Sequence, residues 1–416
     1  MVTEHYVAGL DVGTTKIRTV IASPEEGKLR ILGVGLVPAA GLARGIVVDR
    51  EQATAAIKES VHRAERMAGL QISGAYVGIS GAHIACRNVT GRIHLPGGEV
   101  TPADVEKVIQ SARDNIRTTP EQEIIHALVR DFAVDGEPEI KRPVGMRGSR
   151  LDVEVHIVIG VGSIIGNLQD CVRETGVQVL KDVLEPLATA SAVIKEAERD
   201  LGVMLVDIGG GTTDVAVFHE GSICHTASLP VAGHHVTRDL AQILRCSPEH
   251  AETVKRRFGA ALTDLVTTEE LVPVVEVGTE TPRMVPRRLL AEIIQPRMEE
   301  IFSMVRENLQ SAGVYEAVRG GVVMSGGGSQ LAGCERLASV VLDDLPVRVG
   351  APHGLAGLSD SVQTPIFATA VGLALLAAQE GAWAAPGQPG RWESVVEMAT
   401  AWWHRTVSPW FRKRSR

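Results

Sequence analysis

Two stretches decide the fold: residues 7–22, VAGLDVGTTKIRTVIA, and residues 203–218, VMLVDIGGGTTDVAVF. Each reads as an apolar run, an Asp followed by a Gly- and Thr-rich turn, and a second apolar run, which predicts a β-hairpin. Chance similarity between two glycine-containing hairpins is the alternative interpretation. The recurrence of Asp, Gly and a Thr pair in the same order, about half a chain apart, favours two related lobes that face each other.

Length and composition exclude several classes of protein. The chain has 416 residues, 44% hydrophobic and 22% charged, which is typical of a soluble globular protein of two or three domains. A net charge of −8 argues against a protein that coats nucleic acid. Five dispersed Cys without a CxxC pair fit a reduced cytosol, and we expect no signal peptide at the start. The His residues show no zinc-ligand spacing, so we expect no zinc site.

The segments between the hairpins have recognisable elements. Residues 50–69 have helical spacing and a Gly stop, and residues 101–115 predict a helix with Thr101 as N-cap and Pro102 in its first turn. Residues 83–162 form a small α+β insert, and residues 246–304 form a charged, helix-rich block. The apolar run 366–378 is shorter than the roughly 20 residues that span a bilayer, so we expect a buried helix.

The Gly- and Thr-rich turns have the chemistry of a polyphosphate site. Turns without bulky side chains expose backbone N–H groups and hydroxyls, and Lys16 adds a positive charge. Asp11 and Asp207 can hold the waters of a Mg²⁺ ion. A third cluster, 326–328, could let a flat base approach the backbone. The predicted phosphate and base contacts are Gly13, Thr14, Thr15, Lys16, Gly209, Gly210, Gly211, Thr212, Thr213, Gly326, Gly327 and Gly328.

These three turns, in this order, resemble the phosphate 1, phosphate 2 and adenosine motifs of the actin-like ATPase superfamily, over roughly residues 5–380. Residues 182–188 look like its first connecting helix and 364–376 like its second. Residues 251–259 are similar to the helix whose Glu and Lys reach the nucleoside, here Glu252 and Lys255, and Gly233 is a further candidate contact. The resemblance implies a two-lobed α/β fold of duplicated ribonuclease-H-like domains that binds ATP and Mg²⁺.

Catalytic residues follow from the same resemblance. Glu185 lies where relatives place a side chain that orients water, and Asp207 would act with the metal. For Glu185, an acid at a helix N-terminus before Pro186 is an equally weighted alternative. Asp214 is expected to brace its hairpin. The resemblance implies slow ATP hydrolysis at most.

Within the superfamily, the FtsA family of bacterial cell-division proteins is the most similar. Residues 141–157, KRPVGMRGSRLDVEVHI, and 290–300, LAEIIQPRMEE, look like its signatures. The insert 83–162 resembles its 1C subdomain. One departure is His234, where the family usually has Asn or Asp, which leaves its contribution to the nucleotide site open.

This resemblance implies a function at the division site. Such a protein tethers filaments of FtsZ to the cytoplasmic face of the cell membrane, polymerises head-to-tail with ATP, and contacts other division proteins, but binds no nucleic acid. The C-terminal peptide of FtsZ would dock on subdomain 2B, residues 246–304. The candidate contacts there are Arg283, Arg287, Arg288 and Arg297.

The same resemblance implies a division of the chain into subdomains. Lobe 1A comprises 5–82, 163–202 and a closing helix at 360–380, interrupted by the 1C insert at 83–162. Lobe 2A comprises 203–245 and 305–359, interrupted by 2B at 246–304. A linker at 381–391 leads to a tail at 392–416.

The tail has the features of a membrane-surface anchor. All five Trp lie in the last 34 residues, and the apolar positions from Trp392 follow one helical face. A basic, Trp-rich amphipathic helix binds anionic membranes peripherally; a helix packed on the body is the alternative. The predicted contacts are Trp392, Val395, Val396, Trp402, Trp403, Trp410, Phe411, Arg412, Lys413 and Arg414.

Two other functions remain open. An actin-like adaptor of a type IV pilus assembly platform also carries a 1C-like insert. A small-molecule kinase of the same superfamily would need a catalytic base in a substrate pocket between the lobes, and the sequence identifies none.

Overall fold

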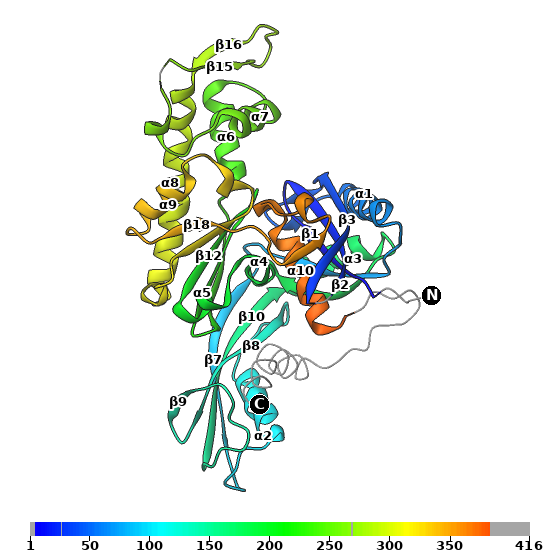
Figure 1. Ribbon diagram of the computed structural model, residues 1–416, viewed down its shortest axis with the longest axis vertical. Coiled ribbons are helices and arrows are strands. Elements are labelled where there is room, and N and C mark those ends of the chain that lie inside the picture. The colour runs from blue at the N-terminus through cyan, green and yellow to red at the C-terminus, as the bar shows by residue number, and fades with distance from the viewer. Residues whose placement is uncertain (1–4, 26, 268, 383–416) are drawn as a thin grey trace.

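The computed structural model describes residues 5–25, 27–267 and 269–382. The predicted membrane contacts from Trp392 to Arg414 therefore lie outside the described residues. Within the described ranges, no helix is both long and apolar enough to cross a membrane. The chain forms two lobes and an insert, each built on its own sheet (Figure 1).

The first lobe has a six-stranded sheet in the order β11-β6-β1-β2-β3-β19. Its strands are β1 (Val7–Val12), β2 (Lys16–Glu25), β3 (Lys28–Pro38), β6 (Gly74–Ile79), β11 (Gln178–Leu184) and β19 (Leu355–Gly357). The short strands β4 (Leu42–Ala43) and β5 (Ile46–Val47) pair with each other. Because β19 pairs with β3, the chain already returns to the first sheet at residue 355, before the boundary expected at 360.

The second lobe repeats this arrangement in the order β18-β17-β12-β13-β14. Its strands are β12 (Val203–Ile208), β13 (Thr213–His219), β14 (Ser222–Leu229), β17 (Val322–Ser325) and β18 (Val347–Val349). In both lobes, three antiparallel strands form a meander, and two further strands extend the sheet in parallel beside the first strand of that meander. The two hairpins predicted from the repeat are confirmed as β1–β2 and β12–β13.

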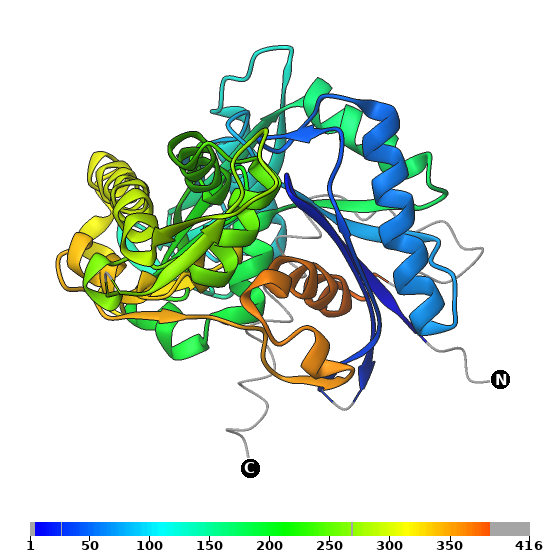
Figure 2. The same cartoon turned by 90° about the horizontal axis from the view of Figure 1, so that it is seen from above.

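Helices cover the first sheet on both faces. On one face lie α1 (Arg50–Ala68) and α3 (Gly162–Arg173). The Asp49 side chain accepts from the backbone of Gln52 at the start of α1, and Gly69 ends it at φ +69°, as expected. On the other face α4 (Glu185–Val193) and α10 (Ala368–Glu380) share one core with strands of both lobes. Seen from above, α10 lies between the two sheets (Figure 2).

The buried helix expected from residues 366–378 is confirmed as α10. Its contact with α4 depends on Gly372, where an added Cβ would lie 1.8 Å from the carbonyl oxygen of Ala188. The first connecting helix was expected to begin at Asp182. It begins at Glu185, because the preceding residues pair with β6 as the end of β11.

The insert is a four-stranded sheet in the order β7-β10-β8-β9 with one covering helix. Its elements are β7 (Ala85–His94), α2 (Pro102–Asp114), β8 (Gln122–Val134), β9 (Glu137–Ile140) and β10 (Arg150–Val161). The helix predicted here is confirmed, and Thr101 with Asp104 forms its capping box.

The remaining elements belong to the second lobe and to the connections. They are α5 (Glu196–Leu201), α6 (Gly233–Leu244), α7 (Pro248–Phe258), β15 (Leu271–Val274), β16 (Arg283–Pro286), α8 (Arg287–Ser311) and α9 (Cys334–Val341). Short 3-10 turns lie at Thr263–Leu265, Tyr315–Ala317, Gly327–Gln330, Ser359–Ser361 and Pro365–Phe367. The insert and the β15–β16 hairpin lie at opposite ends of the long axis (Figure 1).

Candidate functional site

The two Gly- and Thr-rich turns lie against each other between the lobes. An added Cβ at Gly210 would lie 2.3 Å from Cγ2 of Thr15, and one at Gly211 would lie 2.5 Å from Oγ1 of Thr14. These two glycines are thus required for the close approach, because any side chain would push the lobes apart. The fold therefore brings together the turns that were predicted to hold phosphate, Gly13 to Lys16 and Gly209 to Thr213.

Asp11 lies at the end of β1 and pairs with a residue that the sequence analysis missed. Arg18 stands directly opposite Asp11 in the β1–β2 register, and its Nη1 lies 2.6 Å from Oδ2 of Asp11. Burial raises the pKa of Asp11, whereas the charge of Arg18 lowers it. The alternation of Lys16 and Arg18 along a strand was the available signal, since both project to the same side. Two cations therefore face this part of the cleft.

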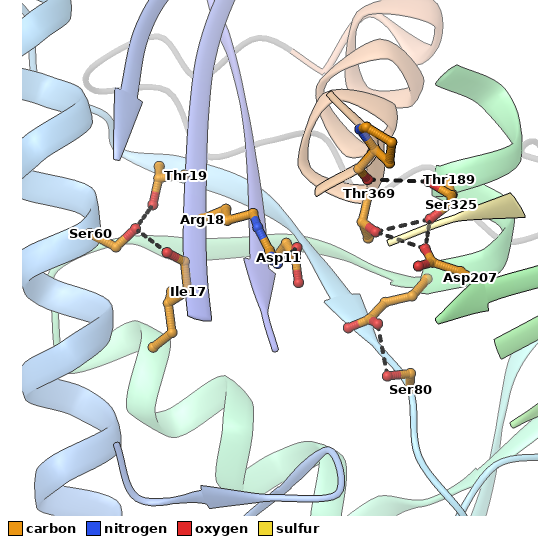
Figure 3. Close-up of polar contacts among 12 residues, drawn as sticks. Asp11, Ile17, Arg18, Thr19, Ser60, Ser80, Thr189, Asp207, Ser325 and Thr369 are labelled. Carbon is orange, nitrogen blue, oxygen red and sulfur yellow. Dashed lines mark hydrogen bonds and ion pairs between the residues drawn. The ribbon is translucent and has the colours of Figure 1, made fainter. Parts of the chain in front are cut away.

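The second carboxylate, Asp207 at the end of β12, is held by hydroxyl groups (Figure 3). Oγ1 of Thr189 in α4 donates to Oδ2 of Asp207 at 2.8 Å, and Thr369 in α10 lies 3.4 Å from the same oxygen. Burial raises the pKa of Asp207 to about 6. Asp207 has no ion pair among the described residues, so its negative charge is available to a cation that enters the cleft.

Glu185 begins a helix and lies half-buried near the other carboxylates. It is the first residue of α4, where the helix dipole favours an acid, and it also faces the other carboxylates. Ser80 donates to its Oε2 at 2.8 Å (Figure 3). Burial, and then the charges of Asp11 and Asp214, raise its pKa well above the ordinary value. In its ionised form a carboxylate at this position can act as a general base toward water.

Asp214 stands directly opposite Asp207 in the second hairpin, as Arg18 stands opposite Asp11 in the first. Thr212 donates to its Oδ2 at 3.1 Å, a contact that fits the expected bracing of the turn. Burial, together with the charge of Asp207, raises the pKa of Asp214 to about 7. The repeat therefore places a cation in one lobe where the other lobe has an acid.

The acids do not form a direct metal cage. Among residues 5–382, apart from the two masked positions, no group of three or more His, Cys, Asp or Glu is arranged to hold a metal ion. Mg²⁺ usually keeps several waters and takes only one or two carboxylates, with phosphates completing its shell. Asp11 and Asp207 fit that kind of site.

The residues expected near the nucleoside form one hydrogen-bonded group on α6 and α7. Nζ of Lys255 lies 2.9 Å from the carbonyl oxygen of Gly233 and 2.5 Å from Oε2 of Glu252. The backbone N–H of Gly233 donates to Gly209 O at 3.1 Å, which ties α6 to the second turn. The backbone N–H of His234 donates to Gly210 O at 2.8 Å, so this contact does not depend on the departure at residue 234.

The third glycine cluster divides into structural and open positions. Gly326 has φ +77°, and an added Cβ would lie 2.3 Å from Oδ1 of Asp207. At Gly328 it would lie 2.3 Å from Cγ2 of Ile208. At Gly327, which is exposed, the nearest atom is Cγ2 of Ile366 at 3.8 Å. Gly327 is therefore the position where a side chain would affect an incoming base more than the fold.

The four arginines proposed for partner binding already have ion-pair partners. Arg283 pairs with Glu276 at 2.9 Å, Arg287 with Glu270 at 2.6 Å, and Arg288 with Glu292 at 3.1 Å. Arg297 joins α8 to α6 through Asp239 at 2.7 Å and also pairs with Glu300. Any acidic partner must exchange with these acids, and Arg297 has the clearest structural role.

Comparison with known proteins identifies the family. Residues 204–372 match the family model described as cell division protein FtsA, and residues 81–159 match the SHS2 domain inserted in FtsA. The protein of Pseudomonas aeruginosa with that name is 39% identical over 90% of this chain and 89% of its own. The one of Escherichia coli is 35% identical over 98% of this chain and 97% of its own.

Solved structures agree on the fold. The PilM–PilN type IV pilus biogenesis complex matches with a TM-score of 0.65 at 19% identity, covering 89% of this chain and 98% of that one. MreB5 of Spiroplasma citri bound to AMPPNP matches with a TM-score of 0.54 at 15% identity, covering 91% and 97%. These likenesses support the actin-like fold alone, whereas the sequence identities reach 35 to 39% across most of the chain. The chain therefore belongs to the FtsA family of actin-like cell-division proteins.

Proposed function

We propose that the protein binds ATP and Mg²⁺ between its lobes and tethers FtsZ filaments to the membrane during cell division. The observation that carries the nucleotide site is the contact between the two Gly- and Thr-rich turns above the buried carboxylates of Asp11 and Asp207. Lys16 and Arg18 would balance phosphate charge. Mg²⁺, when bound, would neutralise charge on the phosphate oxygens. Arg18 holds Oδ2 of Asp11, so Oδ1 is the oxygen that would accept from the metal's waters.

A nucleotide titration tests the site. Asp207→Ala should abolish Mg²⁺-dependent ATP binding, because it removes the buried carboxylate that has no cation partner among the described residues. The exposed Asp360→Ala is the matched control and should bind as the parent does. Equal titrations of Asp207→Ala and the parent protein would remove Asp207 from the site.

Membrane tethering rests on family membership and on the composition of residues 392–416. Vesicles that contain anionic lipid should pellet the protein together with the FtsZ of the same organism. Truncation after Gly390 should abolish pelleting of both, and Trp402→Glu with Trp403→Glu should do the same while the thermal unfolding of the body stays unchanged. Pelleting of the truncated chain would place the anchor elsewhere.

Docking of the FtsZ peptide on residues 246–304 is best tested at the more exposed arginines. The side chains of Arg283 and Arg288 are 53% and 46% exposed, and a carboxylate of the peptide can replace Glu276 or Glu292 there. Arg283→Glu combined with Arg288→Glu should weaken peptide binding and leave ATP binding unchanged. The matched control is Arg66→Glu on α1, whose side chain is 73% exposed. Unchanged peptide binding would exclude both arginines.

Head-to-tail assembly is the remaining part of the proposal. The insert and the 246–304 block lie at opposite ends of the long axis, so a contact between unlike surfaces leaves each end open and propagates (Figure 1). Val144 and Met146 are exposed apolar residues in a loop of the insert, at 52% and 39%. Val144→Glu with Met146→Glu should reduce ATP-dependent sedimentation on lipid without loss of ATP binding. Unaltered sedimentation would exclude this loop.

A further inference from the structure

A histidine of the insert contacts the first lobe at the residue before Glu185. His126 lies on β8 and is 7% exposed. Its Nε2 accepts from the backbone N–H of Leu184 at 3.0 Å, where the insert meets the end of β11 (Figure 1). Leu184 is the last residue of β11 and the cap of α4, so this bond holds the point where the strand turns into the helix.

The start of α4 needs an acceptor from elsewhere in the chain. The first N–H groups of a helix have no partner inside it. The Leu184 side chain cannot cap the helix, and Pro186 has no N–H to donate. The imidazole of His126 therefore supplies, from the insert, an acceptor that the helix itself lacks.

The imidazole of His126 is a permanent acceptor. Since a ring N–H cannot accept, Nε2 is unprotonated and the neutral ring carries its hydrogen on Nδ1. Burial, followed by the charges of Lys181 and His156, lowers the pKa of His126 to about 3. The bond to Leu184 therefore persists throughout the neutral pH range.

The insert that carries His126 is itself held by the second lobe. Nε2 of His156 on β10 lies 3.0 Å from Oγ1 of Thr226 on β14. Nδ2 of Asn88 on β7 donates to the carbonyl oxygen of Cys224 on β14 at 3.1 Å. The insert thus contacts both lobes, and its hold on β14 fixes the position from which His126 reaches α4.

Little free space separates the insert from the start of α4. A cavity of about 10 Å³, close to the size of one water, is lined by Ala85 at the start of β7, by Leu184 and Pro186, and by Thr226 of β14. Closely packed elements transmit small displacements to one another. A shift of the insert is therefore passed on to the two residues that flank Glu185.

The carboxylate of Glu185 is held from the same junction. Ser80 donates to Oε2 of Glu185 at 2.8 Å. Ser80 follows directly on β6, where the chain leaves the first lobe for the insert. The backbone before Glu185 and the end of its side chain are thus both fixed by residues at the border of the insert.

We propose that His126 is a positioning residue through which the insert sets the orientation of the Glu185 carboxylate toward the water that attacks ATP. The proposal rests on the nucleotide site proposed above. In hydrolysis the water oxygen bonds to the γ-phosphorus while the bond from that phosphorus to the bridging oxygen breaks. The electron pair leaves with ADP, and a proton of the water passes through Glu185 to the phosphate product. Because His126 acts on the backbone beside Glu185, its loss should slow hydrolysis and leave ATP affinity unchanged.

Single-turnover hydrolysis of ATP by the full chain, measured beside ATP affinity, tests the proposal. His126→Leu removes the acceptor at similar volume and should slow hydrolysis by about tenfold or more, since a small misplacement of reacting groups is costly. The Kd for ATP should change less than about twofold, because the binding groups stay in place. His126→Gln brings an amide oxygen close to the position of Nε2 and should restore most of the rate.

Gln295→Leu is the matched control. It removes another side-chain acceptor of a backbone N–H, because Oε1 of Gln295 accepts from Thr263 at 2.9 Å in the 246–304 block. The control should hydrolyse ATP at the parent rate, whereas a general effect of lost stability would slow both variants. Should His126→Leu fail to fold, His126→Asn takes its place, because its amide is one CH₂ shorter and stops short of Leu184.

Hydrogen exchange in a peptide that contains Leu184 reports the bond directly. Exchange should be faster in His126→Leu than in His126→Gln. Equal exchange, a rate that His126→Gln does not restore, or a parent protein that binds ATP without hydrolysing it would overturn this inference and leave the proposed ATP site intact. Unchanged hydrolysis in His126→Leu would do the same. A parent protein that binds no ATP would overturn the proposed site and this inference together.

Discussion

Replacing Asp207 by Asn should stabilise the protein in the absence of nucleotide while removing its ability to bind Mg²⁺ and ATP. The carboxylate is 8% exposed, and its pKa rises from 3.8 to about 6 on folding. At pH 8 the ionised group therefore costs the folded state about 3 kcal/mol, at 1.36 kcal/mol for each pKa unit. Asn keeps the shape and can still accept from Thr189, so we expect a gain of about 1–3 kcal/mol after the new amide N–H is accommodated.

The pH dependence has a definite sign. A carboxyl group whose pKa is raised on folding binds its proton more tightly in the folded state. The free energy of unfolding then falls as pH rises from about 3.8 to about 6 and is level above that. The advantage of Asp207→Asn should therefore shrink to about half, near 1.6 kcal/mol before the amide cost, at pH 5.

The measurement is urea unfolding at pH 8 and pH 5, with and without Mg²⁺ and ATP. Saturating ligand at 100 times Kd should stabilise the parent protein by about 2.7 kcal/mol and the variant hardly at all. The exposed Asp360→Asn should shift stability by less than about 0.5 kcal/mol in every condition. A variant less stable than the parent without ligand at pH 8, or a gain that does not shrink at pH 5, would refute the reasoning about the buried charge.

Three further outcomes follow from packing. Gly327→Val should weaken ATP binding at least tenfold with little change in melting temperature. Gly326→Val should lower the melting temperature, because φ is +77° there and an added Cβ would collide with Asp207. Nucleotide titrations and thermal melts of both variants distinguish these two effects. His126→Ala should lower the free energy of unfolding in urea by about 1–3 kcal/mol, because the buried His126 ring accepts from the backbone N–H of Leu184 at 3.0 Å. An unchanged free energy of unfolding would mean that water replaces the imidazole as the acceptor. Gly372→Ala should destabilise the crossing of α4 and α10 in a thermal melt, and an unchanged melt would mean that the helices separate without cost.

Local chemistry allowed much of the architecture to be predicted. The Asp–Gly–Thr repeat predicted both hairpins, and the structure confirms them at β1–β2 and β12–β13. The Gly stop after α1 and the Thr101 cap of α2 were readable because each acts over a single turn, whereas the Asp49 cap of α1 was not predicted. The apolar run of α10 was readable because a helix hydrophobic all round must be buried.

The contents of the site were only partly predictable. Asp11 and Asp207 follow their strands in the sequence and were found. Arg18 was missed, since its importance comes from standing across a hairpin from Asp11. The arginines near α8 were expected as a basic cluster, yet each has an acid partner, and the partner of Arg297 is Asp239 on another helix. Charges counted along a chain do not show which of them are already neutralised.

The sequence by itself therefore determined the elements, the duplication and the family resemblance, because these depend on periodicity and on motifs within a few residues. Only the tertiary structure decided which side chains, far apart in the sequence, lie in contact with one another. Burial raised the pKa values of Asp207 and Asp214, and burial is a property of the packed lobes. Asp207, Thr189 and Thr369 come from β12, α4 and α10, and their meeting depends on how these three elements pack together. No local pattern encodes such a contact, because its free energy exists only once both surfaces have formed.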